Sequence, residues 1–297
     1  MSQTHVMGLQ QWKPVNGRLV MKVVHKGNAN ILIDADDHWL WRICVRDDEL
    51  KKNNEYTAKN VDYIMNVAKP LLGDMLCEIS ITHVPTEKIS HLLQLYVSNL
   101  NDDVTTVIKL PNLIPRSYQC HVVDHFTKLH FSDNMKGIVW EFKPKWLWSD
   151  LDICRNCTHN RLKEREISYC YSMLLMEDKV AHLITEIFSK ACVPPQFIED
   201  VCNYLKQDDT VLRKLYRVQE QAGQHIPSLK SLKCIDDVSD DLCLSMMLKD
   251  VTCFLRWEGD KPISAKIVDV DMKPKTKWQH WAKTQSEIES IPDGVLH

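Results

Sequence analysis

The residues of this sequence that could do chemistry gather in two short segments with one pattern. EFKPK at residues 141–145 follows an apolar run, and DVDMKPK at residues 269–275 follows another. The runs are typical of strands, and proline ends a strand because it has no N–H to donate. Charges such as Glu141, Lys143 and Lys145 that alternate along a strand share one face, where they cannot all be buried unpaired. Either segment alone could be a solvated strand end, but together they indicate a cleft for a heavily phosphorylated molecule.

The aspartates of the second segment are candidate metal ligands. Asp269 and Asp271 alternate with Val270, so we expect their carboxylates to share a face. Carboxylate oxygens suit Mg²⁺, which usually takes one or two protein carboxylates together with phosphates. The lysines that follow suit the phosphates themselves. The alternative for this segment alone is a solvated charge run at the start of a helix.

Three further features could serve the same cleft. The turn KGNAN at residues 26–30 lies between two expected strands, where glycine lets backbone N–H groups face a phosphate, although most such turns are only turns. Arg42 lies within the apolar run WLWRICV and needs a partner, either a carboxylate or a ligand phosphate. Asp250 lies where an apolar helix meets a strand, so its carboxylate is either a helix cap or a general base.

A cysteine-rich segment, CRNCTHN, follows the first charged segment. Cys154, Cys157 and His159, with Cys170 as a fourth ligand, resemble half of a zinc site. The spacing is not a usual finger pattern and no second CxxC exists, so we favour packing and hydrogen bonding for these residues and keep a bound metal as the alternative. The segment also adds cations beside residues 141–145, namely Arg161, Lys163 and Arg165.

Composition excludes several functional classes. The 297 residues carry a net charge of −3, so the chain lacks the basic field that drives binding to DNA or RNA. The 11 cysteines are scattered through apolar runs behind no signal peptide, which indicates reduced thiols of the cytosol or nucleus. No stretch has the length of a membrane-spanning helix. We therefore expect no nucleic acid partner and no membrane span.

The elements that must position these residues follow from periodicity. Residues 1–17 read as a loose lead-in. We expect strands at 19–25, 29–34, 39–45, 104–110, 120–124, 138–142, 251–257 and 263–269. We expect helices at 57–72, 160–176, 179–191, 195–206, 209–221, 238–249 and 275–288. This order predicts an α+β protein with a β-rich lobe over residues 1–124 that binds nucleotide and a mostly helical lobe over residues 125–297 that binds the phosphorylated substrate.

These features together fit an ATP-dependent phosphotransferase with a polyanionic substrate. The HRD and DFG motifs of protein kinases are absent from the sequence, and so is a Walker A motif. The chain is instead similar to the inositol-pentakisphosphate 2-kinases, in their short fungal form. The similarity lies in GNAN at 27–30, EFKPK at 141–145, RNCTHNRLK at 155–163, LKDVTCF at 248–254 and IVDVDMKPK at 267–275, which occur in the family's order.

The resemblance implies a two-lobed fold distantly like protein kinases and a reaction. Enzymes of this family transfer the γ-phosphate of ATP to the axial 2-hydroxyl of inositol pentakisphosphate, which gives inositol hexakisphosphate (phytate). It also implies Mg²⁺, direct in-line transfer without a covalent enzyme intermediate, a monomer, and a nuclear or nucleocytoplasmic location. The alternatives are a kinase of another inositol polyphosphate, whose PxxxDxKxG pattern is absent here, and a non-catalytic inositol-phosphate binding protein.

The resemblance also assigns roles to single residues. Those at the nucleotide are Gly27, Asn28, Ala29, Asn30, Arg42, Glu141, Lys143 and Asp269, with Asp124 at the adenine hinge. Those at the inositol phosphate are Lys145, Lys163, Lys273, Lys277 and Trp281. Asp250 and Lys143 take the catalytic roles, and Asp269 binds the metal. Lys277 and Trp281 stand where the family has arginine and tyrosine, which removes a bidentate phosphate contact and a hydroxyl.

One motif of the family departs more strongly. Its asparagine pair before an arginine is replaced by Asp208-Asp209-Thr210. Arg213 is the nearest arginine, and it is our candidate nucleotide ligand in this region.

Overall fold

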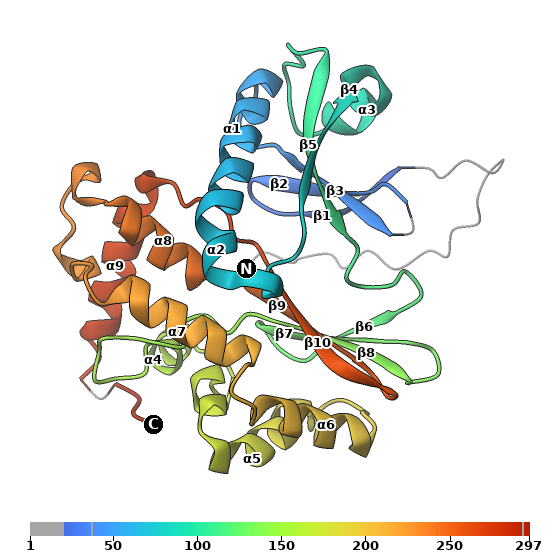
Figure 1. The fold of residues 1–297 in the computed structure, drawn as a ribbon. Helices are drawn as coiled ribbons and strands as arrows, with labels where there is room; N and C mark the ends of the chain where they lie inside the picture. Colours follow the sequence, from blue (N-terminus) through green and yellow to red (C-terminus); the bar gives the residue numbers. More distant parts are fainter. Residues whose placement is uncertain (1–20, 37, 293) are drawn as a thin grey trace. The chain divides into compact units, whose positions relative to one another are not determined.

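The computed structural model describes residues 21–36, 38–292 and 294–297. These residues form a mixed α and β structure with two antiparallel sheets of five strands each (Figure 1). They divide into two compact units. The first holds the described residues up to Ala58 together with Ile79–Asn112, and the second holds Lys59–Glu78 together with Leu113–His297. The predicted α+β class is confirmed. The lead-in expected over residues 1–17 and the start of the strand expected at residue 19 lie outside the described residues.

The first unit is built on a sheet of order β1-β2-β3-β5-β4. Its strands are β1 (Lys22–Lys26), β2 (Asn30–Asp34), β3 (Trp39–Cys44), β4 (Ser80–Pro85) and β5 (Val104–Pro111). Alternate residues of β2 are fully buried and pack with Leu50 of α1 (Leu50–Tyr63) and Ile89 of α3 (Thr86–Leu93). The glycine turn closes the β1–β2 hairpin as expected, and Gly27 N donates to Asn30 O at 2.9 Å.

The long helix of the first unit continues into the second. After α1 the chain makes a π-helical turn, Ile64–Ala68, and then α2 (Lys69–Leu72). It stops at Gly73, whose φ of 59° is the left-handed conformation that glycine adopts without steric cost. The helix expected at 57–72 is therefore correct at its end and begins earlier, at Leu50.

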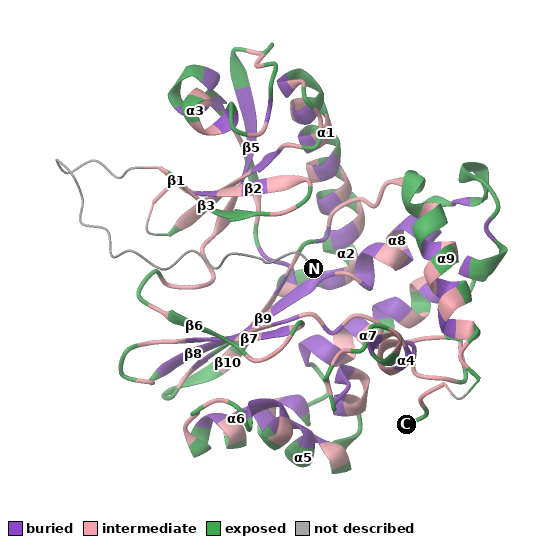
Figure 2. Ribbon diagram, turned by 180° about the vertical axis from the view of Figure 1, so that it is seen from behind, coloured by how far each residue is buried: buried purple, intermediate pink, exposed green. Residues whose placement is uncertain are grey.

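The second unit has its own sheet, of order β10-β9-β8-β7-β6. Its strands are β6 (Gln119–Val122), β7 (Thr127–Phe131), β8 (Gly137–Phe142), β9 (Thr252–Glu258) and β10 (Lys261–Val268). Its middle strand, β8, contains Glu141, precedes the two lysines of EFKPK and is almost fully buried (Figure 2). Trp140 and Phe142 pack against Tyr171, and Trp140 also contacts Phe188.

Helices make up the rest of the second unit. They are α4 (Arg155–Leu162), α5 (Glu177–Phe188), α6 (Pro195–Leu205), α7 (Val211–Gly223), α8 (Asp240–Leu248) and α9 (Trp278–Glu289). Thr210 caps α7 by accepting from Arg213 N, and Ser239 caps α8 by accepting from Leu242 N. No helix among the described residues is both long and apolar enough to cross a membrane.

Several expectations about elements need correction. The helix expected at 160–176 is wrong, because α4 ends at Leu162, Glu164 has a φ of 50°, and only a short 3₁₀ turn follows at Tyr171–Leu175. The expected mostly helical lobe contains a five-stranded sheet. Residues 113–124 and 59–78, which we expected in the N-terminal lobe, group with the second unit. Periodicity also missed β4, α3 and β7.

Candidate active site

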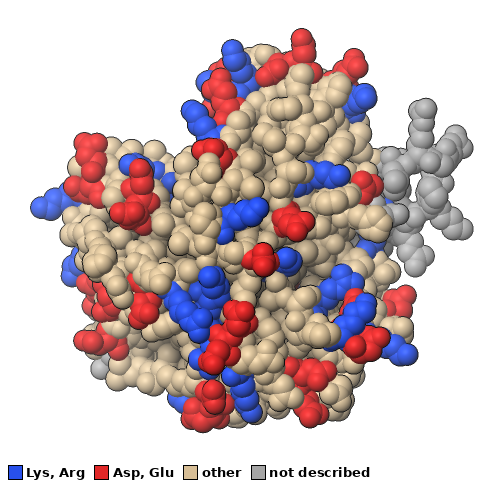
Figure 3. Space-filling view, in the orientation of Figure 1, with Lys and Arg blue, Asp and Glu red and all other residues tan. Residues whose placement is uncertain are grey.

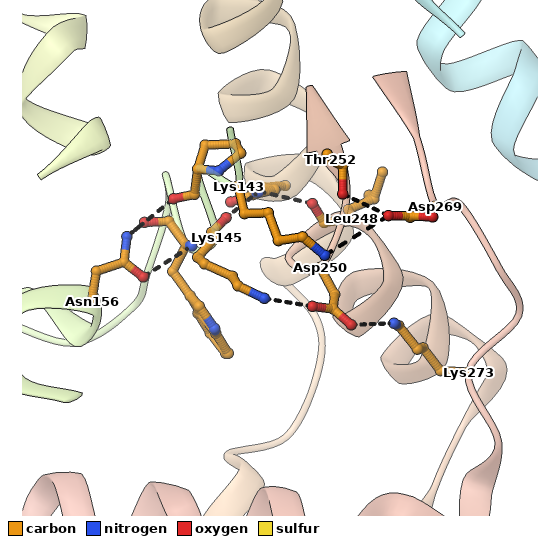
Figure 4. Close-up of polar contacts among 11 residues, drawn as sticks. Lys143, Lys145, Asn156, Leu248, Asp250, Thr252, Asp269 and Lys273 are labelled. Carbon is orange, nitrogen blue, oxygen red and sulfur yellow. Dashed lines mark hydrogen bonds and ion pairs between the residues drawn. The ribbon is translucent and has the colours of Figure 1, made fainter. Parts of the chain in front are cut away.

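Lysines from the two charged segments meet on one carboxylate. Lys145 Nζ donates to Asp250 Oδ1 at 2.6 Å, and Lys273 Nζ donates to Asp250 Oδ2 at 2.5 Å (Figure 4). Burial alone would raise the pKa of Asp250, but the two lysines lower it to about 2. The side chain of Asp250 is still 43% exposed. An ionised, accessible carboxylate between two cations is therefore the centre of the site.

A second carboxylate lies at the end of the neighbouring strand. Asp269 Oδ2 accepts from Thr252 Oγ1 at 2.6 Å, and Lys143 Nζ lies 3.8 Å from the same oxygen (Figure 4). Half of the Asp269 side-chain surface is exposed. A hard oxygen ligand fixed at one atom and accessible to solvent can bind a divalent cation that also takes phosphate oxygens.

Unusual backbone conformations direct these side chains. Lys145 has a φ of 59° and Asp269 a φ of 65°, the left-handed region that residues with a Cβ seldom adopt. β8 ends at Phe142 and β10 ends at Val268, so the alternation of β8 includes Glu141 but not Lys143 or Lys145, and that of β10 stops before Asp269. The shared faces expected for Glu141, Lys143 and Lys145, and for Asp269 and Asp271, are therefore wrong.

A buried glutamine holds the first charged segment in place. Gln219 of α7 is fully buried; its Nε2 donates to Lys145 O at 2.8 Å and to Leu248 O at 3.0 Å, and its Oε1 accepts from Leu147 N at 2.8 Å. One amide thus connects α7, the segment of Lys145 and the end of α8 that leads to Asp250. Sequence reasoning missed Gln219, although a glutamine on the apolar face of an amphipathic helix was the available signal.

Asn156 at the start of α4 holds the same segment from another direction. Its Nδ2 donates to Trp146 O at 2.8 Å and to Pro144 O at 3.3 Å, and its Oδ1 accepts from Trp146 N at 3.2 Å (Figure 4). The peptide groups on both sides of Lys145 therefore have fixed partners, and the left-handed turn at Lys145 is stabilised.

Asn60, near the end of α1, performs the same task for the second charged segment. It is 1% exposed, its Oδ1 accepts from Met272 N at 2.9 Å, and its Nδ2 donates to Asp271 Oδ1 at 2.8 Å. Asp271 is thereby engaged with an amide, whereas Asp269 contacts Thr252 and Lys143. Metal binding by Asp269 stays a prediction, and the two aspartates differ in the partners that hold them.

Glu141 has its contacts within the sheet. On β8 it accepts from Lys128 Nζ and from His130 Nε2 of β7, each at 2.9 Å. Burial alone would raise the pKa of Glu141, but hydrogen bonds from His130 and Lys128 lower it to about 2. Burial alone would lower the pKa of His130, but hydrogen bonds to Cys120 and Glu141 raise it to about 9. None of these contacts joins Glu141 to Lys143 or Lys145, and its role at the nucleotide stays a prediction.

Asp124 closes the turn between β6 and β7. Its Oδ1 accepts from Phe126 N at 2.7 Å, and its Oδ2 accepts from the hydroxyl of Tyr169. Both carboxylate oxygens therefore have structural partners, and any part that Asp124 takes at a nucleotide hinge stays a prediction.

The nucleotide candidates of the first unit are neighbours in one hairpin and strand. Ala29 O accepts from Val45 N at 2.8 Å, so Gly27, Asn28, Ala29 and Asn30 lie beside the end of β3. With its amide oriented to satisfy its neighbours, Asn30 accepts from Arg42 Nη2 at 3.0 Å. Arg42, for which we expected a carboxylate or a phosphate, thus has at least an amide partner.

Other candidate residues have their recorded contacts away from Asp250. Lys163 Nζ lies 3.8 Å from Glu287, and Arg213 Nη2 lies 3.7 Å from Glu177. Lys277 occupies the N-cap position of α9 but makes no side-chain capping hydrogen bond there. Trp281 is 5% exposed and packs with Leu229 and Leu242 in an apolar cluster. The structure therefore places Trp281 in an apolar core cluster, and its role at the inositol phosphate stays a prediction.

Arg165, which the sequence placed only near the first charged segment, lies close to the site. Arg165 Cζ lies 5.2 Å and Lys145 Nζ 5.9 Å from the ring centre of Phe126. Burial, followed by the charges of Arg165 and Lys145, lowers the pKa of the adjacent His125. The positive region around Asp250 therefore extends past Phe126. It is local, because Lys and Arg are interspersed with Asp and Glu on the face drawn in Figure 3.

Comparison with known proteins gives consistent matches. The family described as "Inositol-pentakisphosphate 2-kinase" matches residues 24–287. A Saccharomyces cerevisiae protein named inositol-pentakisphosphate 2-kinase is 42% identical over 91% of this chain and 96% of its own length. Proteins of the same name from Eremothecium gossypii and Candida glabrata are 38% and 37% identical, over 94% and 93% of this chain and 100% of their own lengths.

Proposed function

The chain belongs to the inositol-pentakisphosphate 2-kinase family, and we propose that it transfers the γ-phosphate of ATP to the 2-hydroxyl of inositol 1,3,4,5,6-pentakisphosphate. The product is inositol hexakisphosphate. The observation that carries the proposal is Asp250 with a lysine on each oxygen. A carboxylate can accept a hydroxyl proton, and the two ammonium groups can bind phosphates on either side of that hydroxyl.

In this mechanism Asp250 and its lysines respond to the substrate. Phosphates that bind Lys145 and Lys273 draw positive charge away from the carboxylate, so the pKa of Asp250 rises from about 2 towards its ordinary range. The carboxylate then orients the 2-hydroxyl and accepts its proton as the oxygen attacks phosphorus in line with the leaving group. Lysines held in place before the reaction provide most of the rate by positioning and electrostatics.

Asp269 and Lys143 form the nucleotide side of the proposal. Asp269 fits Mg²⁺ because its carboxylate is half exposed to solvent and supplies hard oxygen ligands, while Thr252 and Lys143 fix its orientation. Mg²⁺, when bound, neutralises charge on the ATP phosphates. Lys143, which lies beside Asp269, would bind the same phosphates. The backbone N–H groups of the KGNAN turn and Arg42, both in the first unit, are the proposed further contacts to ATP.

Incubation of the full chain with ATP, Mg²⁺ and inositol 1,3,4,5,6-pentakisphosphate tests the proposal. The expected product carries a new phosphate at position 2, which phosphorus NMR identifies. The 2-hydroxyl is the one free hydroxyl of this substrate, so turnover of other inositol polyphosphates without turnover of this one would indicate a kinase of another inositol polyphosphate. Binding without consumption of ATP would indicate a non-catalytic binding protein. The carboxylates beside the lysines favour the kinase, because a site made only for anions gains nothing from them.

We also propose that the chain acts as a monomer in the nucleus or between nucleus and cytoplasm. Both proposals depend on the family resemblance alone. Light scattering of the purified chain tests the first, and microscopy of a fluorescent fusion tests the second.

A further inference from the structure

Four potential metal ligands from three separate segments converge beside α4. They are Cys154, Cys157, Cys170 and His297, and their ligand atoms all lie within 4.8 Å of one another. Among the described residues, these four side chains are arranged closely enough to hold one metal ion. Cys154 is the N-cap of α4 and Cys157 lies in its first turn, Cys170 precedes the 3₁₀ turn at Tyr171–Leu175, and His297 comes from the far end of the sequence.

The distances within the group match those between ligands of one tetrahedral zinc ion. Ligands at about 2.3 Å for sulfur and about 2.0 Å for nitrogen lie roughly 3.5–3.8 Å apart around such an ion. Here Cys154 Sγ and Cys170 Sγ are 3.6 Å apart, and Cys157 Sγ and His297 Nε2 are 3.5 Å apart. A disulfide needs sulfurs at about 2.05 Å, and all of these cysteines are free.

We propose that Cys154, Cys157, Cys170 and His297 bind one structural Zn²⁺. Three sulfurs and one imidazole complete the tetrahedral set that closed structural zinc sites use, which leaves no position for substrate. Binding converts three thiols to thiolates and releases three protons to solvent, while the imidazole binds in its neutral form. The donor set selects zinc over Mg²⁺, which prefers oxygen ligands.

The structure replaces the histidine ligand that the sequence suggested. His159 follows Cys157 by two residues, but it does not belong to the group, and its place is taken by His297. Burial, with Arg155 adding to it, lowers the pKa of His159 to about 4. A histidine 140 residues beyond Cys157 could not be found from spacing.

Backbone contacts already hold the ligand segments together. Cys154 N donates to Val295 O at 2.7 Å, and Val295 N donates to Thr158 Oγ1 at 3.1 Å. These two hydrogen bonds fix the segment of His297 against α4. Ser172 Oγ lies 3.0 Å from Cys170 Sγ, so a hydroxyl can donate to that thiolate. The site is thus organised by contacts that do not depend on the ion.

The proposed zinc site is connected to the active site through Asn156. Its Nδ2 lies 3.9 Å from Cys170 Sγ and donates to Trp146 O, next to Lys145. Zinc would fix the first turn of α4, on which Asn156 lies, and would thereby fix the segment that carries Lys145. The ion would support the fold and the position of this segment without contacting substrate.

Metal analysis of the purified full chain tests the proposal. We expect about one zinc per chain after removal of loosely bound metal, and a cobalt-substituted protein with the absorption of a tetrahedral thiolate site. His297→Ala should weaken zinc binding by roughly 10-fold or more while the protein stays folded, because His297 is exposed. Cys157→Ser should abolish the cobalt spectrum.

His159→Ala is the matched control for His297→Ala. The proposed ligand set requires that His159→Ala keep its zinc and its cobalt spectrum. Loss of zinc from His159→Ala but not from His297→Ala would overturn the assignment of the fourth ligand. A folded wild-type chain that holds no zinc and gives no cobalt spectrum would overturn the site itself. Neither outcome bears on whether the chain phosphorylates inositol pentakisphosphate.

Discussion

At the scale of single residues, the site is defined by one carboxylate shared between two lysines. Asp250 is the only group that both Lys145 and Lys273 contact among the recorded interactions of the described residues, so each cation is oriented by the same charge. These two ion pairs hold both lysines in position, and the lysines remain able to exchange Asp250 for substrate phosphates, which carry more negative charge.

Asp250→Asn removes the proton acceptor while nearly keeping the shape of the side chain. Turnover should fall by roughly 10²-fold or more, because general-base catalysis contributes at least this much, while the KM for ATP stays nearly unchanged. Steady-state kinetics with both substrates measures the effect. Asp260→Asn, in the β9–β10 turn, is the control and should behave like wild type. Unchanged turnover in Asp250→Asn would remove Asp250 from the mechanism.

Lys145→Ala removes a cation that we assign to a substrate phosphate. The KM for inositol pentakisphosphate should rise by roughly 10-fold or more, far above any change for ATP, because a charge-assisted contact contributes about 1.5–3 kcal/mol. Lys190→Ala, at the exposed end of α5, is the matched control. A larger rise in the KM for ATP than in the KM for inositol pentakisphosphate would instead assign Lys145 to the nucleotide.

At the scale of elements, the site depends on helices whose amide side chains hold the backbone of its charged segments. α7 contributes Gln219, α4 contributes Asn156 and the end of α1 contributes Asn60, and each amide binds the backbone of a charged segment. Buried amides of this type specify one backbone path, because leaving any of their groups unpaired costs free energy.

Gln219→Leu tests this dependence. The substitution leaves the peptide groups of Lys145, Leu147 and Leu248 without their partner, and we expect the free energy of unfolding to fall by roughly 2–4 kcal/mol. Turnover should fall as well, since the left-handed turn at Lys145 loses its support. Denaturant unfolding and kinetics measure both effects. Gln221→Leu, exposed on the same helix, should change neither, and a stable, fully active Gln219→Leu would refute the role.

The sequence predicts elements well where burial follows one period. The apolar positions of α5, α6, α7 and α8 and the run of β8 place these elements within a few residues. β4 was missed because most of its residues are exposed and show no alternation. The charged segments were found by residue type, but their geometry depends on the left-handed Lys145 and Asp269, which only tertiary contacts impose on residues with a Cβ.

At the scale of the whole molecule, one buried lysine makes stability depend on pH. Lys249 of the second unit is 3% exposed, donates to Ser245 Oγ at 2.9 Å, and lies 3.9 Å from the ring centre of Trp146. Burial, with a smaller contribution from Arg155, lowers the pKa of Lys249 from 10.5 to about 7. The unfolded chain therefore binds more protons than the folded chain between these pH values.

We expect the second unit to become more stable as the pH rises from about 7 to about 10. Folding releases a proton from Lys249 in this range, and a higher pH favours that release. Lys249 destabilises the fold below about pH 7, and loss of this penalty raises stability by roughly 3–5 kcal/mol between about pH 7 and the upper end of this range. Lys249→Met should raise the free energy of unfolding at neutral pH and reduce its increase between about pH 7 and about pH 10. Comparing the two proteins removes other titrating groups, such as His130, from the result. Parallel pH profiles for both would contradict the pKa of Lys249.

The division of the chain into units has a consequence for its synthesis. The sheet of the first unit is complete once β5 has been made, but residues 59–78 belong to the second unit. Asn60 must wait for Asp271, 211 residues later in the chain. At about 5–20 residues per second, a ribosome needs roughly 10–40 s to deliver that partner. During this interval we expect the end of the long helix to be the segment on which a chaperone acts.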